Sequence, residues 1–250
     1  MSAARKKRRA KEKAVDKVIK KTVVPVAKAK AAAQMLFKMN EGRIKRYCEC
    51  RVLPTIAFTM HRRFGWGAKK IGRMALKIEW FIKEYIEAGI KAKRVYITVP
   101  WLWDGLNEEC KINYIPREVN QEPKDESDCR SWLDIHAKQC SINCLDYLEC
   151  IWLWILHTEF GFGHKRILQA REEISKINPL EVPIKMIYDM MDIVEKLKAA
   201  TEEEKIRFTT LREDLEKMDI THNGFEEGLV LAFKKAKKGN INVKCVQKRH

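Results

Sequence analysis

The chain has 250 residues, 46% of them hydrophobic, which is enough for one large folded domain or two of ordinary size. Its 50 Lys and Arg against 34 Asp and Glu give a formal net charge of +16, which favours a polyanionic partner. The longest apolar run, Cys150–Leu156, is far shorter than the roughly 18–20 residues that cross a bilayer, so the sequence argues against a membrane span.

The positive charge is concentrated at the N-terminus. Residues 1–30 hold twelve Lys or Arg and two acids, a net charge of +10. Residues 1–34 are rich in Lys and Ala and contain no aromatic residue, which predicts a flexible basic arm that orders on a polyanion. A solubilising tail is the alternative. The arm residues expected to contact phosphates are Arg5, Lys6, Lys7, Arg8 and Arg9.

Two helices are expected after the arm. The apolar pattern is helical from residue 31 to about His61, and Pro54 is expected to break or kink that helix. Apolar residues at three- and four-residue steps predict an amphipathic helix over Lys69–Ala88, ended by Gly89.

The next segment changes character. The run Val95–Val99, of β-branched residues and one tyrosine, predicts a short strand stopped by Pro100, within a small extended element near residues 94–115. Trp101 and Trp103 follow at an expected loop and are the tryptophans expected to be exposed, where they could stack on bases.

The remainder is predicted to be helical. A long helix is expected over Cys129–Thr158, with Ser127 or Asp128 as its N-cap. Further helices are expected from residue 164 to Asn178, stopped by Pro179, and over Ile184–Lys198, Glu202–Met218 and Gly224–Lys238. Thr201 with Glu204, and Asn223 with Glu226, have the spacing of a capped helix start. The predicted segments are the arm (1–34), a first helical repeat unit with the extended element (35–115), a linker (116–128), a second repeat unit with C-terminal helices (129–240) and a basic tail (241–250).

An internal repeat is the most informative feature. The sequence HRRFGWGAKKI over residues 61–71 recurs as HTEFGFGHKRI over residues 157–167, an offset of 96 residues without a gap. Cys48 and Cys144 also coincide at this offset. The repeat predicts two homologous helical hairpins packed as a pseudo-twofold pair in a mainly α-helical, helix-turn-helix-like fold.

The motif has a physical interpretation. The helix that carries the histidine ends near the phenylalanine, and the two glycines permit the positive φ values of a C-cap and a tight reversal. The aromatic residue between them is expected to be buried between the two helices, and His61 and His157 to hydrogen-bond the turn. The residues expected to form the turns are Phe64, Gly65, Trp66 and Gly67 in the first copy, and Phe160, Gly161, Phe162 and Gly163 in the second.

Basic residues follow each turn. A helix start carries free N–H groups and partial positive charge, so cations there point to phosphate binding rather than helix stability. The alternative is that they only face solvent. The residues assigned to this nucleic-acid site are Lys69, Lys70, Arg73, Lys165 and Arg166. The duplicated units are expected to meet two successive sites on one duplex.

The motif His-x-x-Phe-Gly-Phe-Gly-x-Lys-Arg, followed by an acidic amphipathic helix, resembles short uncharacterised proteins of phages and prophages of Gram-positive bacteria. Those proteins usually carry one copy. Here two copies cover about residues 40–88 and 130–178, and the first departs from the pattern at Trp66 and Lys70. The resemblance implies a phage-derived origin and no particular activity.

Other chemistry is less well supported. His136, Cys140 and Cys144 recur at four-residue steps on a predicted helix and are weak candidates for zinc, the alternative being small core residues. No cofactor is expected. The eight cysteines, without a secretory signal, predict free thiols and a cytoplasmic protein. No nucleotide-binding, zinc-protease or nucleophile motif occurs, which predicts that the protein is not an enzyme.

The sequence therefore predicts a non-enzymatic protein that binds DNA or RNA through phosphates. The alternative is a phage-type interaction protein that inhibits or modulates a host nucleoprotein machine, such as a CRISPR-type defence complex or RNA polymerase. A weaker alternative gives the arm a role at an anionic membrane or inside a capsid.

Overall fold

The computed structural model describes residues 40–83, 99–113, 117 and 129–218, together with 31, 34, 35, 37 and 38. This part of the chain is mainly helical, as predicted, and contains no strand. Two compact units are present, and residues 43–119 and 139–218, which include both copies of the motif, form one of them. None of the described helices has the length and apolar character needed to cross a membrane.

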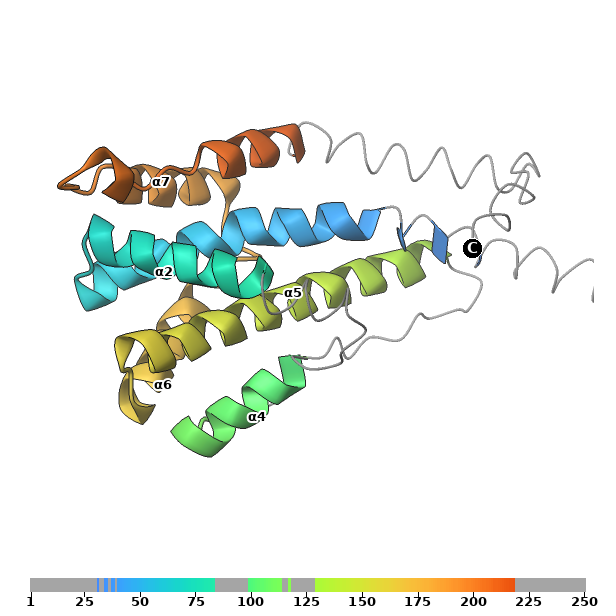
Figure 1. Ribbon diagram of the computed structural model, residues 1–250. Coiled ribbons are helices and arrows are strands. Elements are labelled where there is room, and N and C mark those ends of the chain that lie inside the picture. Colours follow the sequence, from blue (N-terminus) through green and yellow to red (C-terminus); the bar gives the residue numbers. More distant parts are fainter. Residues whose placement is uncertain are drawn as a thin grey trace, which may run out of the picture. The chain divides into compact units, whose positions relative to one another are not determined.

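Two long helices lead into the two glycine turns. A helix over residues 40–64 precedes the first turn, and α5 (Cys129–Phe160) precedes the second (Figure 1). Of the break or kink expected at Pro54, the break is wrong, because the first long helix continues through this residue to residue 64. In α5, every side chain from Cys144 to Leu156 is buried except Tyr147 and Trp154, which are half-buried. A helix that is buried all round takes the centre of the fold.

A shorter helix follows each turn. The first, α2 (Ala68–Trp80), buries Ala68, Ile71, Met74 and Ile78, spaced so that they form one stripe. The second, α6 (His164–Ile177), ends at Asn178, whose left-handed φ of 47° caps the helix immediately before Pro179, as predicted. The end predicted for the first of these helices, at Ala88, lies outside the described residues, which continue to residue 83 as a π-helical turn.

The expected extended element is wrong where the structure describes it. Val99 begins α4 (Val99–Cys110), and Pro100 stands in the first turn of this helix. A proline is well tolerated there, because the first N–H groups of a helix have no intrahelical acceptor. Trp101 is 52% exposed, as expected, but Trp103 is buried.

The C-terminal part also differs from the prediction. The helix α7 (Ile184–Glu195) agrees with expectation, but the helix expected over Glu202–Met218 is broken into a short 3₁₀ turn, η2 (Glu202–Glu204), and a helix over residues 209–218. Thr201 precedes the turn without a side-chain capping bond. The helix over residues 209–218 is capped by a residue at the end of α7, since the backbone N–H of Phe208 donates to Glu195 Oε1 at 2.6 Å. The predicted helix Gly224–Lys238 lies outside the described residues.

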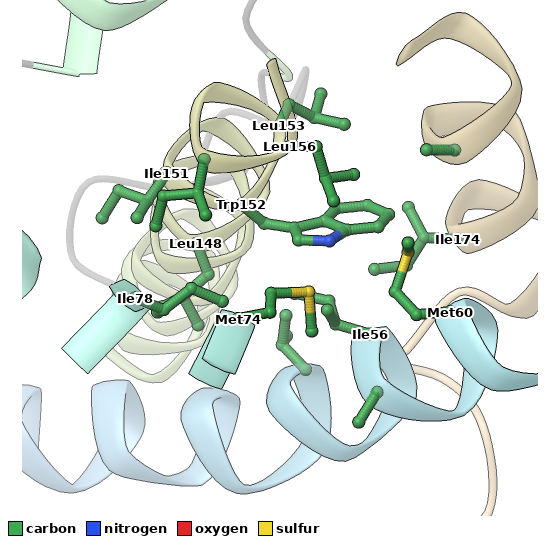
Figure 2. Close-up of a cluster of buried hydrophobic side chains, with 14 of the residues drawn as sticks. Ile56, Met60, Met74, Ile78, Leu148, Ile151, Trp152, Leu153, Leu156 and Ile174 are labelled. Atoms are coloured by element: carbon green, nitrogen blue, oxygen red, sulfur yellow. The ribbon is translucent and has the colours of Figure 1, made fainter. Parts of the chain in front are cut away.

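The hydrophobic core is centred on Trp152 of α5. Figure 2 shows its indole ring surrounded by Ile56 and Met60 of the first long helix, Met74 of α2 and Ile174 of α6. Each helix thus contributes apolar side chains to one cluster. Core packing is what sets the position of the two turns relative to each other.

A buried arginine joins the first long helix to the loop before α7. Arg51 is 3% exposed, and its Nε donates to the carbonyl of Pro179 at 2.8 Å, while Nη2 donates to the carbonyl of Val182. Its guanidinium also lies over the ring of Tyr47. The two carbonyls lie in a loop and have no donor within a helix, so the guanidinium supplies the hydrogen bonds that they need when the loop is buried.

Glu149 is a buried carboxylate in the middle of α5. It is held by Arg171, whose Nε lies 3.0 Å from Oε1, and by Arg117, whose Nη2 lies 2.7 Å from Oε2. Burial raises the pKa of Glu149, and the two guanidiniums oppose that shift. The cluster ties residue 117 and α6 to the central helix.

Candidate nucleic-acid interface

The two glycine turns have the same backbone geometry. Gly65 and Gly161 have φ values of 66° and 64°, in the left-handed region that favours glycine. Gly67 and Gly163 have extended backbones and act as N-caps of the following helices. The sequence prediction is therefore confirmed for the first glycine of each pair and wrong for the second, which does not need a positive φ.

Matching hydrogen bonds close the turns. In the first, the N–H of Gly65 donates to the carbonyl of His61 at 3.0 Å, and the N–H of Trp66 donates to that of Met60 at 3.2 Å. In the second, the corresponding bonds run from Gly161 to His157 at 3.2 Å and from Phe162 to Leu156 at 3.0 Å. The bond from each glycine N–H to the carbonyl four residues before it is that of an αL cap, and the second bond, to the carbonyl six residues before its donor, closes the turn.

Each motif histidine is part of its turn. His61 Nδ1 lies 3.0 Å from the carbonyl oxygen of Trp66, and His157 Nδ1 lies 2.9 Å from that of Phe162. A carbonyl oxygen only accepts, so Nδ1 donates in both. This agrees with the expected turn-bonding role. His157 also contacts Glu109 of α4 through Nε2, at 2.6 Å.

The aromatic residues of the two turns pack against each other. Phe64 of the first turn contacts Phe162 of the second, with ring centroids 5.3 Å apart. Trp66 contacts Phe160 at 4.7 Å and Phe162 at 5.8 Å. Trp66 and Phe162 are 4% and 2% exposed, so the residue between the two glycines is buried in both turns, as predicted.

Two ion pairs between the repeat copies are also related by the offset of 96 residues. Arg63 of the first copy pairs with Glu173 of the second at 2.6 Å. At the equivalent positions, Glu159 of the second copy pairs with Lys77 of the first at 2.9 Å. The charges are reversed but the geometry is shared. The ring contacts and these ion pairs place the two turns face to face.

The structure divides the predicted phosphate-binding residues into two groups. Lys69 lies 3.3 Å from Glu204 of η2, and Arg73 lies 3.6 Å from Glu159. These two cations already have carboxylate partners. Sequence reasoning missed both acids, since Glu204 is distant in sequence and Glu159 stands inside the motif at a position that is not shared between its copies.

The other three cations, Lys70, Lys165 and Arg166, are exposed and have no ion-pair partner in the part of the chain that the structure describes. Lys70 Nζ lies 5.7 Å from the ring centroid of Trp66, and Arg166 Cζ lies 4.3 Å from that of Phe162. Cations over aromatic faces are held in place while their charge remains available to an anion.

No side chain of the first turns offsets the partial positive charge at the starts of the helices that carry these cations. Neither Gly67 nor Gly163 provides a side-chain cap, and the first turns of α2 and α6 contain no acidic residue. The first N–H groups of each helix therefore add partial positive charge to the Lys and Arg side chains.

The remaining candidates are the residues of the basic arm and the possible zinc ligands. Arg5, Lys6, Lys7, Arg8 and Arg9 lie outside the described residues. His136, Cys140 and Cys144 belong to no group of three or more metal-binding side chains within the described part of the chain. Comparison with known protein families, curated proteins and solved structures finds no match for this chain.

Proposed function

We propose that the protein binds a nucleic-acid duplex through the surface where its two glycine turns meet, in helix-turn-helix-like units that arose by duplication. The observation that supports this most directly is the gathering of Lys70, Lys165 and Arg166 over two uncapped helix starts. Backbone N–H groups beside exposed cations suit phosphate oxygens. The net charge of +16 favours the same class of partner.

The spacing of the cations suggests how a duplex would be met. The steps from Lys70 Nζ to the Trp66 ring (5.7 Å), from that ring to Phe162 (5.8 Å) and on to Arg166 Cζ (4.3 Å) limit the separation of the two charges to about 16 Å. Two helix-turn-helix units on successive major grooves would be about 34 Å apart. We therefore replace the expectation of two successive sites with contacts to the two strands that border one groove, which are about 6 Å apart across the minor groove and 12 Å across the major groove.

The test is fluorescence anisotropy with labelled double- and single-stranded DNA and RNA at two salt concentrations. The variant replaces Lys70, Lys165 and Arg166 with Gln. A matched control removes the same charge from Lys185, Lys196 and Lys198, which are exposed near α7 and form no ion pair with a described residue. A 35–250 truncation separates the contribution of the arm.

We expect the variant of Lys70, Lys165 and Arg166 to bind duplex at least about tenfold more weakly. The slope of the logarithm of its binding constant against the logarithm of the salt concentration should decrease in size by about one for each phosphate that it no longer neutralises. The control variant should keep most of its affinity. Equal weakening in both variants, or no binding to any nucleic acid at low salt, would contradict the proposal. Loss of binding on removal of the arm alone would assign binding to the arm and leave the turns as scaffold.

A second candidate function is binding to a protein within a nucleoprotein complex. It is favoured by apolar side chains on the outer face of α2, where Leu76 is 68% exposed and Trp80 is 49% exposed. These lie on the same helix as the basic residues, so one surface could engage both protein and nucleic acid. Capture from a nuclease-treated lysate with wild-type protein and a Leu76→Lys variant tests this. A stoichiometric protein partner that the variant fails to capture would support it.

A further inference from the structure

Two cysteines at equivalent positions of the repeat face each other between the two long helices. Cys48 of the first long helix and Cys144 of α5 are 0% and 8% exposed, and both are free thiols. Cys48 Sγ lies 3.8 Å from the carbonyl oxygen of Ser141, on α5. Cys144 Sγ lies 3.6 Å from the carbonyl oxygen of Lys45, on the first long helix.

These contacts are reciprocal. The same offset of 96 residues that relates the two cysteines also relates Lys45 to Ser141, so each thiol reaches the backbone one turn before the other cysteine. Each thiol reaches across to the backbone of the opposite helix, so both thiols lie in the space between the two helices.

The ionisation of the two thiols agrees with this geometry. A hydrogen bond from Cys144 lowers the pKa of Cys48, whereas the contact with Cys48 and burial raise the pKa of Cys144. One sulfur can therefore hold a negative charge while the other keeps its proton. Cys50, two residues further on the same helix, shares no such hydrogen bond with a thiol of the described residues, and burial raises its pKa to about 11.

We propose that Cys48 and Cys144 form a reversible disulfide that cross-links the first long helix to α5. The oxidant is a low-molecular-weight disulfide. The Cys48 thiolate attacks one sulfur of the oxidant, whose S–S bond breaks, and the first small thiolate leaves and takes up a proton. Cys144 then loses its proton and attacks the Cys48 sulfur of the mixed disulfide, so that the second small thiolate leaves and is protonated. Two protein thiols give up two electrons, and the oxidant becomes two small thiols.

The cross-link would act on the fold, and it is independent of the nucleic-acid proposal. It closes a loop that contains the first glycine turn and α2, and such closure removes conformational entropy from the unfolded chain. Because the sulfurs are buried, thiol–disulfide exchange requires local opening where the two helices cross. The equilibrium between reduced and cross-linked protein is therefore measured rather than the rate of oxidation.

The experiment incubates the purified full-length protein to equilibrium in buffers of rising ratio of oxidised to reduced glutathione. Samples are quenched in acid, alkylated under denaturing conditions, digested and analysed by mass spectrometry. Trypsin leaves Cys48 and Cys50 on one peptide, residues 47–51, so the assignment uses a Cys50→Ser background. Thermal midpoints of oxidised and reduced protein are compared by circular dichroism.

We expect a cross-linked peptide joining residues 47–51 to the peptide with Cys144, and a rise in the thermal midpoint of several degrees on oxidation. Cys48→Ser and Cys144→Ser should each abolish both effects, while Cys140→Ser should retain them. Circular dichroism of each reduced variant checks that it is folded. A cross-link that survives in Cys48→Ser, or none at any glutathione ratio in folded protein, would overturn the proposal.

Discussion

The two glycine turns have nearly the same backbone and different surroundings. Both begin with a glycine at a φ near 65° and both bury an aromatic residue against the other turn. Yet the start of α2 lies beside the acidic turn η2, through Lys69 and Glu204, whereas the start of α6 contacts the end of α4, where His164 Nδ1 donates to the carbonyl of Cys110. The local sequence determines the turn, and elements outside the repeat determine what surrounds it.

The largest expected effect comes from breaking the contact between the turns. Trp66→Ala and Phe162→Ala should each cost about 3–5 kcal/mol of stability, because each removes a buried ring. The rings touch, at 5.8 Å between centroids, so the double variant should be destabilised by about 1 kcal/mol less than the sum of the two single variants. Urea unfolding followed by circular dichroism measures this.

The control for that cycle is Phe208, which is buried outside the two turns, before the helix over residues 209–218. The loss of stability in Phe208→Ala should add to that in Trp66→Ala within about 0.5 kcal/mol. If Trp66 and Phe162 are also strictly additive, the turns do not support each other as the ring contacts indicate.

The glycine pairs give the next largest effect and separate two roles within each turn. Gly65→Ala and Gly161→Ala should each cost about 1–2 kcal/mol, because alanine is strained at positive φ. Gly67→Ala and Gly163→Ala should cost less, about 0.5–1 kcal/mol, since their backbones are extended and only the preference of an N-cap for glycine over alanine is lost. A Cβ at any of the four would meet no atom within 4 Å, so the difference is conformational. Thermal unfolding of the four variants tests it, and equal destabilisation in all four would contradict this assignment.

The turns were predictable because their chemistry is local. Glycine spacing, the buried aromatic residue and the turn-bonding histidines all follow from eleven adjacent residues. The stop at Asn178 and Pro179 was predictable for the same reason. By contrast, Val99 was expected at the end of a strand, and it begins α4 instead, because the packing of this helix overrides a local preference. The close approach of Gly105 to the indole of Trp154, where a Cβ would come within 2.8 Å, is part of that packing.

The site was predictable only in part. The sequence identified the cations but not their partners, because Glu204 reaches Lys69 from a turn that was expected to be helical. It also suggested a pseudo-twofold pair, but not that the turns would lie within ring contact. Such distances depend on how the long helices cross, and the sequence pattern carries no measure of crossing position.

The interchanged ion pairs offer a smaller test of the comparison. A double-mutant cycle of Lys77→Ala with Glu159→Ala should give a coupling of about 0.2–1 kcal/mol, which falls with added salt because both side chains are partly exposed. The equivalent pair, Arg63 with Glu173, should couple more weakly, since Arg63 is 59% exposed. Unfolding at two salt concentrations measures both couplings, and a stronger second pair would show that geometry outweighs exposure.

The smallest effect on stability should come from Glu204→Gln. This variant tests whether Glu204 competes with phosphate at the start of α2, a competition that the start of α6 lacks in the described residues. Glu204→Gln keeps an acceptor for the backbone N–H of Ala200, which lies 3.1 Å from Oε2, but removes the charge beside Lys69. Lys69 is 83% exposed, so the stability should hardly change. If the start of α2 binds phosphate, affinity for duplex should rise about 2- to 5-fold, as removal of one competing surface charge implies. Glu203→Gln, on the same turn without a described cation partner, is the matched control. An equal rise in both variants would reflect net charge alone, and no rise in either would leave α6 as the one phosphate-binding start.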